Sequence, residues 1–193
     1  VKNLQSFGQT VVIAFNKFAT DTDEEIEVLR KHCEEMGCGF AVNSAFAEGG
    51  NGAIELANLV VKTIDERPSA PLYFAYDDND SVEEKIEKVA FNLYGAGSVT
   101  LSDSAKAMIE EIKKLGAEKF PICIAKTQYS FSTDAKAYGP TEGFELHVRD
   151  ITVNMGAEMI VVIAGPIMRM PGLPKSPQAE RIDVVNGEIT GLS

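Results

Sequence analysis

Apolar and polar positions along the first third of the chain follow the pattern of strands that lead into helices. Residues 11–15 form an unbroken apolar, β-branched run, which is typical of a strand buried on both faces of a parallel sheet. Thr22 and Glu25 then have the spacing of a helix capping box. The segment behind them places its apolar side chains on one helical face, at Ile26, Leu29, Cys33 and Met36.

The same order of strand and helix occurs a second time. Residues 39–46 read as a short strand, and the glycine-rich turn AEGGNG leads into a predicted helix over 53–64. This βαβα order predicts a parallel sheet. Charged, proline and small residues follow at 65–71 and mark a boundary. We therefore predict a Rossmann-like βαβα unit, a linker and a C-terminal α+β domain, at residues 1–66, 67–76 and 77–193.

Two helices are predicted at the start of the C-terminal domain. Ser81 and Glu84 have the spacing of a second capping box, and Gly95 closes the helix behind them. Another helix follows Ser102, and Gly116 is a natural stop for it.

The rest of the C-terminal domain reads as strands and turns. Phe144, Leu146 and Val148 alternate with polar neighbours, as in a half-buried strand, for which we expect antiparallel pairing. The other predicted features are strands at 121–125 and 159–164, a proline-rich loop at 166–177, and a hairpin at 182–192 that turns at Asn186-Gly187. The predicted fold class is α/β, a βαβα parallel-sheet unit followed by a smaller α+β domain with antiparallel strands.

The charge of the chain limits its partners. With 18 Lys+Arg against 29 Asp+Glu, the net charge is -11, which repels phosphate backbones and argues against nucleic acid and anionic membranes. The longest apolar runs fall far short of the roughly 20 residues that a bilayer span needs. The first residues lack the pattern of a signal peptide. Three cysteines also cannot all pair within one chain, so we predict a protein of the reducing cytoplasm.

Cysteine and histidine positions do not suggest a metal site. Cys33 and Cys38 lie close together without a nearby second pair, and the two histidines are far apart in sequence. Cys123 lies inside the apolar run PICIA, so we expect a buried structural thiol there.

Two phenylalanines follow the two predicted strands of the first unit. Phe18 and Phe46 should therefore project at the same carboxyl-terminal edge of the sheet, where open parallel sheets bind ligands. Together they could hold one planar ring, such as pterin or adenine, by stacking. The alternative is that both are core residues. Guanine is not expected, because Ala19 stands where the guanine-reading NKxD signature has its aspartate.

Two further polar segments could touch a ligand. The segment AKTQYSFS places Lys126, Gln128 and Tyr129 at the end of a predicted strand, either to position a substrate or to serve in a turn. The proline-rich loop and the residues after it are locally basic, with Arg169, Lys175 and Arg181. These basic residues could meet an anionic ligand or pack against another subunit.

Four segments of the chain together resemble one enzyme family. FNKFATDTDEE, AFAEGGNG, PICIAKTQYSFSTD and MPGLPKSPQAERIDVVNGEITGL resemble successive blocks of the formyltetrahydrofolate synthetases, in family order. The resemblance implies a ligase of one-carbon metabolism that joins formate to tetrahydrofolate with ATP, through formyl phosphate. It also implies Mg²⁺, a monovalent cation and a cytoplasmic homotetramer.

The phosphate-binding loop of that family lies in an N-terminal P-loop domain. This chain contains no G-x-x-x-x-G-K-[ST] motif, so we expect a fragment that lacks that domain, has no catalytic residue of its own and is inactive alone. Its basic loop could then meet the glutamate tail of the folate.

The resemblance also implies which residues bind the substrates. Phe18 and Phe46 match the aromatic pair of the pterin or adenine pocket, where Phe46 replaces the usual tryptophan and Glu48 replaces a commoner lysine. The folate- or adenine-binding set is Phe18, Phe46, Val42, Asn16, Lys17, Gly49 and Gly50, and the possible substrate-positioning set is Lys126, Gln128 and Tyr129. Two alternatives stay open, a stand-alone module that binds folate or nucleotide without catalysis, and an oligomerisation domain.

Overall fold

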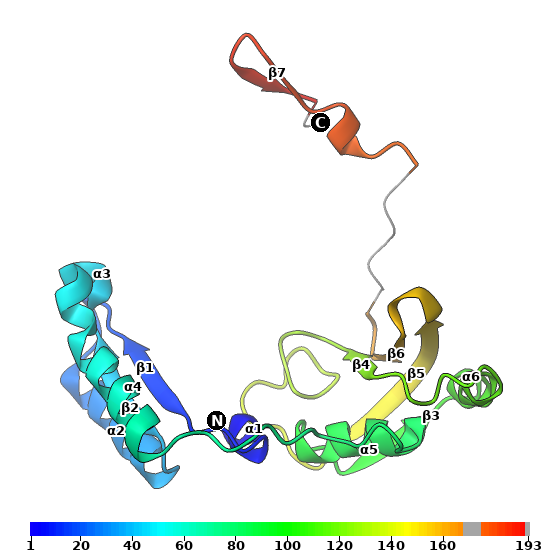
Figure 1. Ribbon diagram of the computed structural model, residues 1–193, viewed down its shortest axis with the longest axis horizontal. Coiled ribbons are helices and arrows are strands. Elements are labelled where there is room, and N and C mark those ends of the chain that lie inside the picture. Colours follow the sequence, from blue (N-terminus) through cyan, green and yellow to red (C-terminus); the bar gives the residue numbers. More distant parts are fainter. Residues whose placement is uncertain (168–174, 192–193) are drawn as a thin grey trace.

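The first unit of the fold is built on two parallel strands. The computed structural model describes residues 1–167 and 175–191, and Figure 1 shows the first unit in blue and cyan. Strand β1 (Val12–Asn16) pairs with β2 (Gly39–Asn43) in register, from Val12 opposite Gly39 to Asn16 opposite Asn43. The predicted parallel pairing is confirmed.

Two helices pack on this pair of strands. The predicted capping box is present at the start of α2 (Asp23–Glu35), where the Thr22 hydroxyl accepts from the Glu25 backbone and the Glu25 carboxylate accepts from the Thr22 backbone at 2.9 Å. The second helix, α4 (Ile54–Glu66), matches the predicted helix. Val11, Ile26, Cys33, Cys38 and Phe40 form the buried core of this unit.

The predicted second strand is too long. It ends at Asn43, and residues up to Phe46 belong to a turn and a short helix, α3 (Ala45–Glu48), which continues into the 3-10 helix η1 (Gly49–Ala53). The side-chain oxygen of Asn43 accepts from the Ala45 backbone N–H at 3.3 Å, a bond that turns the chain out of the strand.

A segment without helix or strand joins the two halves of the chain. It runs over residues 67–81, between α4 and α5 (Val82–Asn92). A short helix that the sequence did not reveal, α1 (Lys2–Ser6), contacts the second half, because Asn3 donates to the Leu93 carbonyl at 3.0 Å. The division into domains at 67–76 stays a prediction.

The second half contains a four-stranded mixed sheet. Its order is β3-β5-β6-β4, with both outer pairs parallel and the central pair antiparallel. The strands are β3 (Ser98–Leu101), β4 (Ile122–Ala125), β5 (Glu145–Asn154) and β6 (Met159–Ala164), and the 3-10 helix η2 (Met155–Ala157) connects the last two. Antiparallel pairing is thus confirmed for β5 and β6, whereas β3 and the parallel outer pairs were not foreseen.

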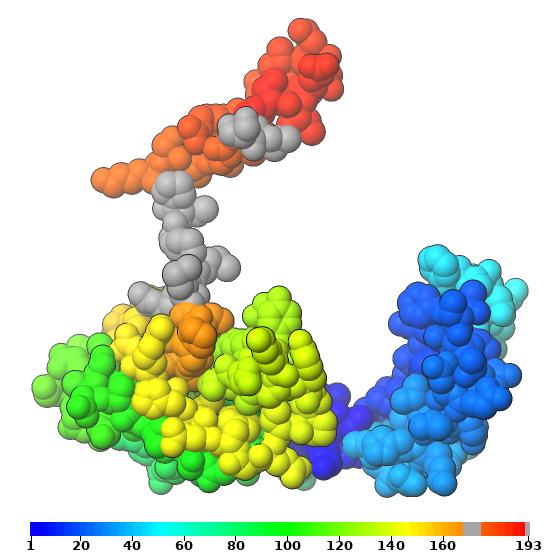
Figure 2. Space-filling model, turned by 180° about the vertical axis from the view of Figure 1, so that it is seen from behind, coloured from blue at the N-terminus to red at the C-terminus, as the bar shows by residue number. Residues whose placement is uncertain are grey.

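Helices cover one face of this sheet. Helices α5 and α6 (Asp103–Lys114) bury Ile86 and Ile109 against Leu146 and Val162 of the central strands. On β5, Leu146 and Val148 face these helices and are buried, whereas His147 between them points to the opposite face and is exposed. In Figure 2 the two halves form separate masses, blue to cyan and green to orange.

The expected burial of Cys123 is wrong. Cys123 is exposed, although Ile122 and Ile124 beside it pack toward the core. Because side chains alternate along a strand and β4 lies at the sheet edge, the thiol points to the face opposite the helices.

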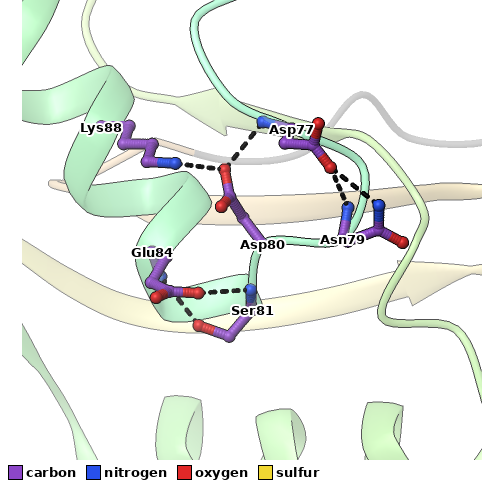
Figure 3. Close-up of polar contacts among 6 residues, drawn as sticks. All are labelled: Asp77, Asn79, Asp80, Ser81, Glu84 and Lys88. Atoms are coloured by element: carbon purple, nitrogen blue, oxygen red, sulfur yellow. Dashed lines mark hydrogen bonds and ion pairs between the residues drawn. The ribbon is translucent and has the colours of Figure 1, made fainter.

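The start of α5 is held by two sets of polar contacts, which Figure 3 shows. Ser81 and Glu84 form the predicted capping box, with the Glu84 carboxylate accepting from the Ser81 backbone at 2.8 Å. Just before it, the Asp80 carboxylate accepts from the Lys88 ammonium at 2.5 Å and from the Asp77 backbone at 2.7 Å.

The chain ends in the predicted hairpin. Strands β7 (Asp183–Val185) and β8 (Glu188–Thr190) pair antiparallel, after the 3-10 helix η3 (Gln178–Glu180). Asn186 and Gly187 both have positive φ, at 53° and 83°, as the tight turn requires. Arg169 and residues 168–174 of the predicted proline-rich loop lie outside the described residues.

Candidate ring-binding edge and lysine cavity

The carboxyl-terminal ends of β1 and β2 are joined by side chains as well as by backbone. Asn43 donates from its side-chain amide to the Asn16 side-chain oxygen at 2.8 Å, and the Lys17 backbone donates to the Asn43 carbonyl at 3.0 Å. Lys17 also forms an ion pair of 3.3 Å with Asp23 in the first turn of α2. Asn16 and Lys17 therefore fix the strand ends in place.

Both phenylalanines lie exposed beyond these strand ends. Phe18 follows β1 in a turn that Asp21 closes, because the Asp21 carboxylate accepts from the Phe18 backbone at 2.7 Å. Phe46 is carried by α3 behind β2. Their side chains are 64% and 95% exposed. The alternative that they are core residues is therefore wrong for the described structure.

Glycines shape the segment that carries Phe46. Gly49 has a φ of 60°, a left-handed value that other residues rarely adopt. Gly50 is exposed in open space. Gly52, which the sequence did not single out, packs so tightly that an added Cβ would lie 2.5 Å from the backbone carbon of Ser44. The Gly52 carbonyl accepts from the Ser44 backbone at 3.0 Å, so the turn closes on itself.

Val42 lies one residue before the strand end. It is half-buried and packs against the core of the first unit, opposite Phe15 in the strand register. Val42 therefore anchors the carboxyl-terminal end of β2 to the core.

The second candidate site is a cavity at the end of β4. The structure brings the predicted Lys126, Gln128 and Tyr129 together around a hollow of about 390 Å³. The sequence did not reveal two other lining residues, Tyr94 at the end of α5 and Phe131. Tyr94 directly precedes Gly95 at a helix end, and that position gave no sign of the cavity.

Lys126 is surrounded by neutral groups. Its ammonium donates to the carbonyls of Ser130 and, at 3.4 Å, Thr127. It also lies 4.6 Å from the centre of the Tyr94 ring and 5.8 Å from that of Phe131. Burial lowers the pKa of Lys126. Burial also raises the pKa of Tyr94, with a smaller contribution from Cys123.

Metal ligands do not gather in the part of the chain that the structure describes. Residues 1–167 and 175–191 hold no group of three or more His, Cys, Asp or Glu side chains that could bind an ion. Cys33 and Cys38 are both buried. Burial raises the pKa of the Cys33 thiol, and the neighbouring Cys38 raises it further.

No helix in residues 1–167 and 175–191 is long and apolar enough to cross a membrane.

The parallel pair β1 and β2 with its packed helices places this chain in the class of the α/β proteins. The family model of formate–tetrahydrofolate ligase matches residues 1–193, and the chain belongs to that family. It is 64% identical over 193 residues to the formate–tetrahydrofolate ligase of Bacteroides fragilis, and 55% identical over 193 residues to that of Porphyromonas gingivalis. The Campylobacter curvus ligase is 48% identical over 196 residues. Each match covers 100% of this chain, which spans 35% of each relative's length.

Proposed function

We propose that this chain is the ring-binding part of an ATP-dependent formate–tetrahydrofolate ligase, with Phe18 and Phe46 as two walls of a slot for pterin or adenine. One observation carries the proposal: two large aromatic side chains remain 64% and 95% exposed at one sheet edge of a chain that matches the ligase family throughout. Exposed aromatic faces stack on planar heterocycles at a gain of roughly 1–3 kcal/mol per ring in nucleic-acid systems.

The proposed reaction has two steps in the complete ligase. Formate takes a phosphoryl group from ATP to give formyl phosphate, and the N10 amine of tetrahydrofolate then attacks the formyl carbon. Phosphate leaves and the amine loses its proton. The proposed enzyme also uses Mg²⁺ and a monovalent cation, and the contribution proposed for this chain is to hold the ring.

Holding the folate ring in place contributes to the rate without an acid or a base. Positioning the amine beside the formyl donor converts an encounter of two molecules into a step within one complex, which is worth several orders of magnitude in rate. Gly49 and Gly50 directly follow α3, the helix that carries Phe46, and backbone groups at glycines can approach a ring closely. We further propose a cytoplasmic homo-oligomer, with the phosphate-binding loop supplied elsewhere in the ligase. The chain alone should therefore form no formyltetrahydrofolate.

The slot can be tested by alanine substitution in the full-length protein. Phe18→Ala and Phe46→Ala should each weaken tetrahydrofolate or ATP binding about tenfold or more, since about 1.4 kcal/mol is tenfold, and should leave the melting temperature nearly unchanged. Phe74→Ala is the matched control, because Phe74 is 81% exposed and lies outside the slot. Unchanged affinity for both ligands in a folded Phe18→Ala/Phe46→Ala double variant would refute the slot.

A further inference from the structure

The Lys126 ammonium has no counter-charge among residues 1–167 and 175–191. Within residues 1–167 and 175–191 it forms no ion pair, and its bonds go to the neutral carbonyls of Thr127 and Ser130. Burial alone accounts for the lowered pKa of its side chain, without a contribution from a neighbouring charge. A positive charge that is partly removed from water without an anion beside it is held at a cost in free energy.

Lys85 shows what a purely structural lysine looks like in the same fold. It is fully buried and donates to two backbone carbonyls, those of Glu118 and Phe120. Burial lowers its pKa as well, but Asp78, Asp80, Asp77 and Glu118 oppose that shift. Lys126 differs in two respects, since it borders a cavity and has no such acidic neighbour in the part of the chain that the structure describes.

The surroundings of Lys126 suit a ring as well as an anion. The cavity of about 390 Å³ falls in the size range of small-molecule sites, which runs from about 300 to 1,000 Å³. Tyr129 and Phe131 line it and are 66% and 45% exposed. The site also lies at the carboxyl end of β4, which runs parallel to β6, the end at which parallel sheets bind ligands.

We propose that this cavity, the Lys126 cavity, binds a small organic anion that consists of a planar ring carrying a carboxylate or a phosphate group. The oxyanion pairs with the Lys126 ammonium, and the ring packs against the exposed faces of Tyr129 and Phe131. Gln128, on the same rim, orients the anion by hydrogen bonding. The proposal is independent of the Phe18 and Phe46 slot, so either can fail without the other.

Four probes separate the parts of this ligand, titrated calorimetrically into the full-length protein. Benzoate and phenyl phosphate carry both ring and charge, benzamide carries the ring alone, and inorganic phosphate carries the charge alone. We expect benzoate or phenyl phosphate to bind at least tenfold more tightly than benzamide and than inorganic phosphate. Equal binding of benzamide overturns the role of the charge, and equal binding of inorganic phosphate overturns the role of the ring.

Substitutions then locate the binding. Lys126→Met should weaken it at least tenfold, because a charge-assisted hydrogen bond to a partly buried group is lost. Lys136→Met is the matched control, since Lys136 is exposed on the same segment and should have no effect. Gln128→Ala, at an exposed position, should weaken binding more modestly. Binding should persist in the Phe18→Ala/Phe46→Ala variant, and its loss there would move the site to the other edge and overturn the proposal.

A measurement on the unaltered protein guards against a folding defect in Lys126→Met. The pKa of the Lys126 ammonium, followed by NMR of its side chain, should rise when the tighter of benzoate and phenyl phosphate is added, because a bound anion stabilises the charged form. An unchanged pKa at saturating probe overturns the proposal, as does the absence of saturable binding by either probe.

Discussion

The side-chain amide of Asn43 donates a hydrogen bond of 2.8 Å to the side-chain oxygen of Asn16, and this bond joins the last residues of β1 and β2. The oxygen of the same Asn43 side chain accepts from the Ala45 backbone at 3.3 Å. One residue therefore fixes both the pairing of the strand ends and the start of α3, the helix that carries Phe46.

This double role predicts unequal effects of two alanine substitutions. Asn43→Ala removes both bonds and Asn16→Ala only one, and each bond contributes about 0.5–1.5 kcal/mol. Asn43→Ala should therefore weaken ring binding several-fold more than Asn16→Ala, because it also releases α3. Titration of both variants with tetrahydrofolate and ATP measures the difference. Equal losses would show that the bond to Ala45 does not position Phe46.

Two glycines of the turn behind Phe46, Gly50 and Gly52, should respond differently to substitution by alanine. Gly52→Ala should destabilise the protein by about 1–3 kcal/mol, the usual cost of overpacking, because the new Cβ would lie 2.5 Å from the Ser44 backbone. Gly50→Ala should cost much less, since nothing lies within 4 Å of its Cβ position. Urea unfolding of both variants gives the comparison. A well-folded Gly52→Ala protein with unchanged stability contradicts the close approach.

The contacts at the start of α5 predict a dependence of stability on pH. The pKa of Asp80 lies below its ordinary 3.8, chiefly because its carboxylate accepts a hydrogen bond from Lys88. The hydrogen bond from the Asp77 backbone is the second cause. Hydrogen bonds from Ser81 similarly lower the pKa of Glu84 below 4.5. Because the folded pKa values are depressed, the stabilisation is present above these ordinary values and is lost as the pH falls through the folded ones.

Asp80→Asn should therefore be less stable than the wild type at neutral pH, and this difference should shrink as the pH falls below 3.8. The control is Asp78→Asn, which changes an exposed neighbour in the same loop. Unfolding free energies of the three proteins across the acidic range test this expectation. A difference that stays constant down to the lowest pH would rule out the charged carboxylate as the cause.

Substitution of the buried Lys85 in α5 should lower the free energy of unfolding, although Lys85 lies outside both candidate sites. Its ammonium donates to the Glu118 carbonyl at 2.6 Å and to the Phe120 carbonyl at 3.2 Å. Lys85→Met leaves both carbonyls unpaired, at about 1–3 kcal/mol each, and recovers part of this by removing a buried charge. We expect a net loss of about 2 kcal/mol by urea unfolding. Lys106→Met, at an exposed position of α6, should change stability little, and a Lys85→Met protein as stable as wild type would contradict the assignment.

Local signals were the most reliable guide from sequence to fold. The two capping boxes were predicted because each depends on residues three positions apart, and Asn186-Gly187 was recognised as a turn because both positions need positive φ. The strand at Met159–Ala164 was predicted with its observed bounds, since an apolar run of that length suits a buried strand.

Features that depend on distant parts of the chain were missed. Ser98–Leu101 is too short and too polar to be recognised, and becomes a strand only because it pairs with β5. The apolar neighbours of Cys123 predict a core position, but the run lies in the edge strand β4, where Cys123 is exposed. Tyr94 joins Lys126 around the cavity only through tertiary packing, which leaves no pattern in the sequence.

The contacts of Lys85 determine which sequence changes the segment around Glu118 and Phe120 can tolerate. The two hydrogen bonds that the ammonium donates go to the backbone carbonyls of Glu118 and Phe120, and every residue type carries such a carbonyl. The Glu118 side chain can therefore be exchanged without loss of the bond, whereas a residue inserted or deleted there would move the carbonyls out of reach. The helix thus constrains the length of this connection more strongly than its composition, and a library that randomises position 118 should yield many folded variants.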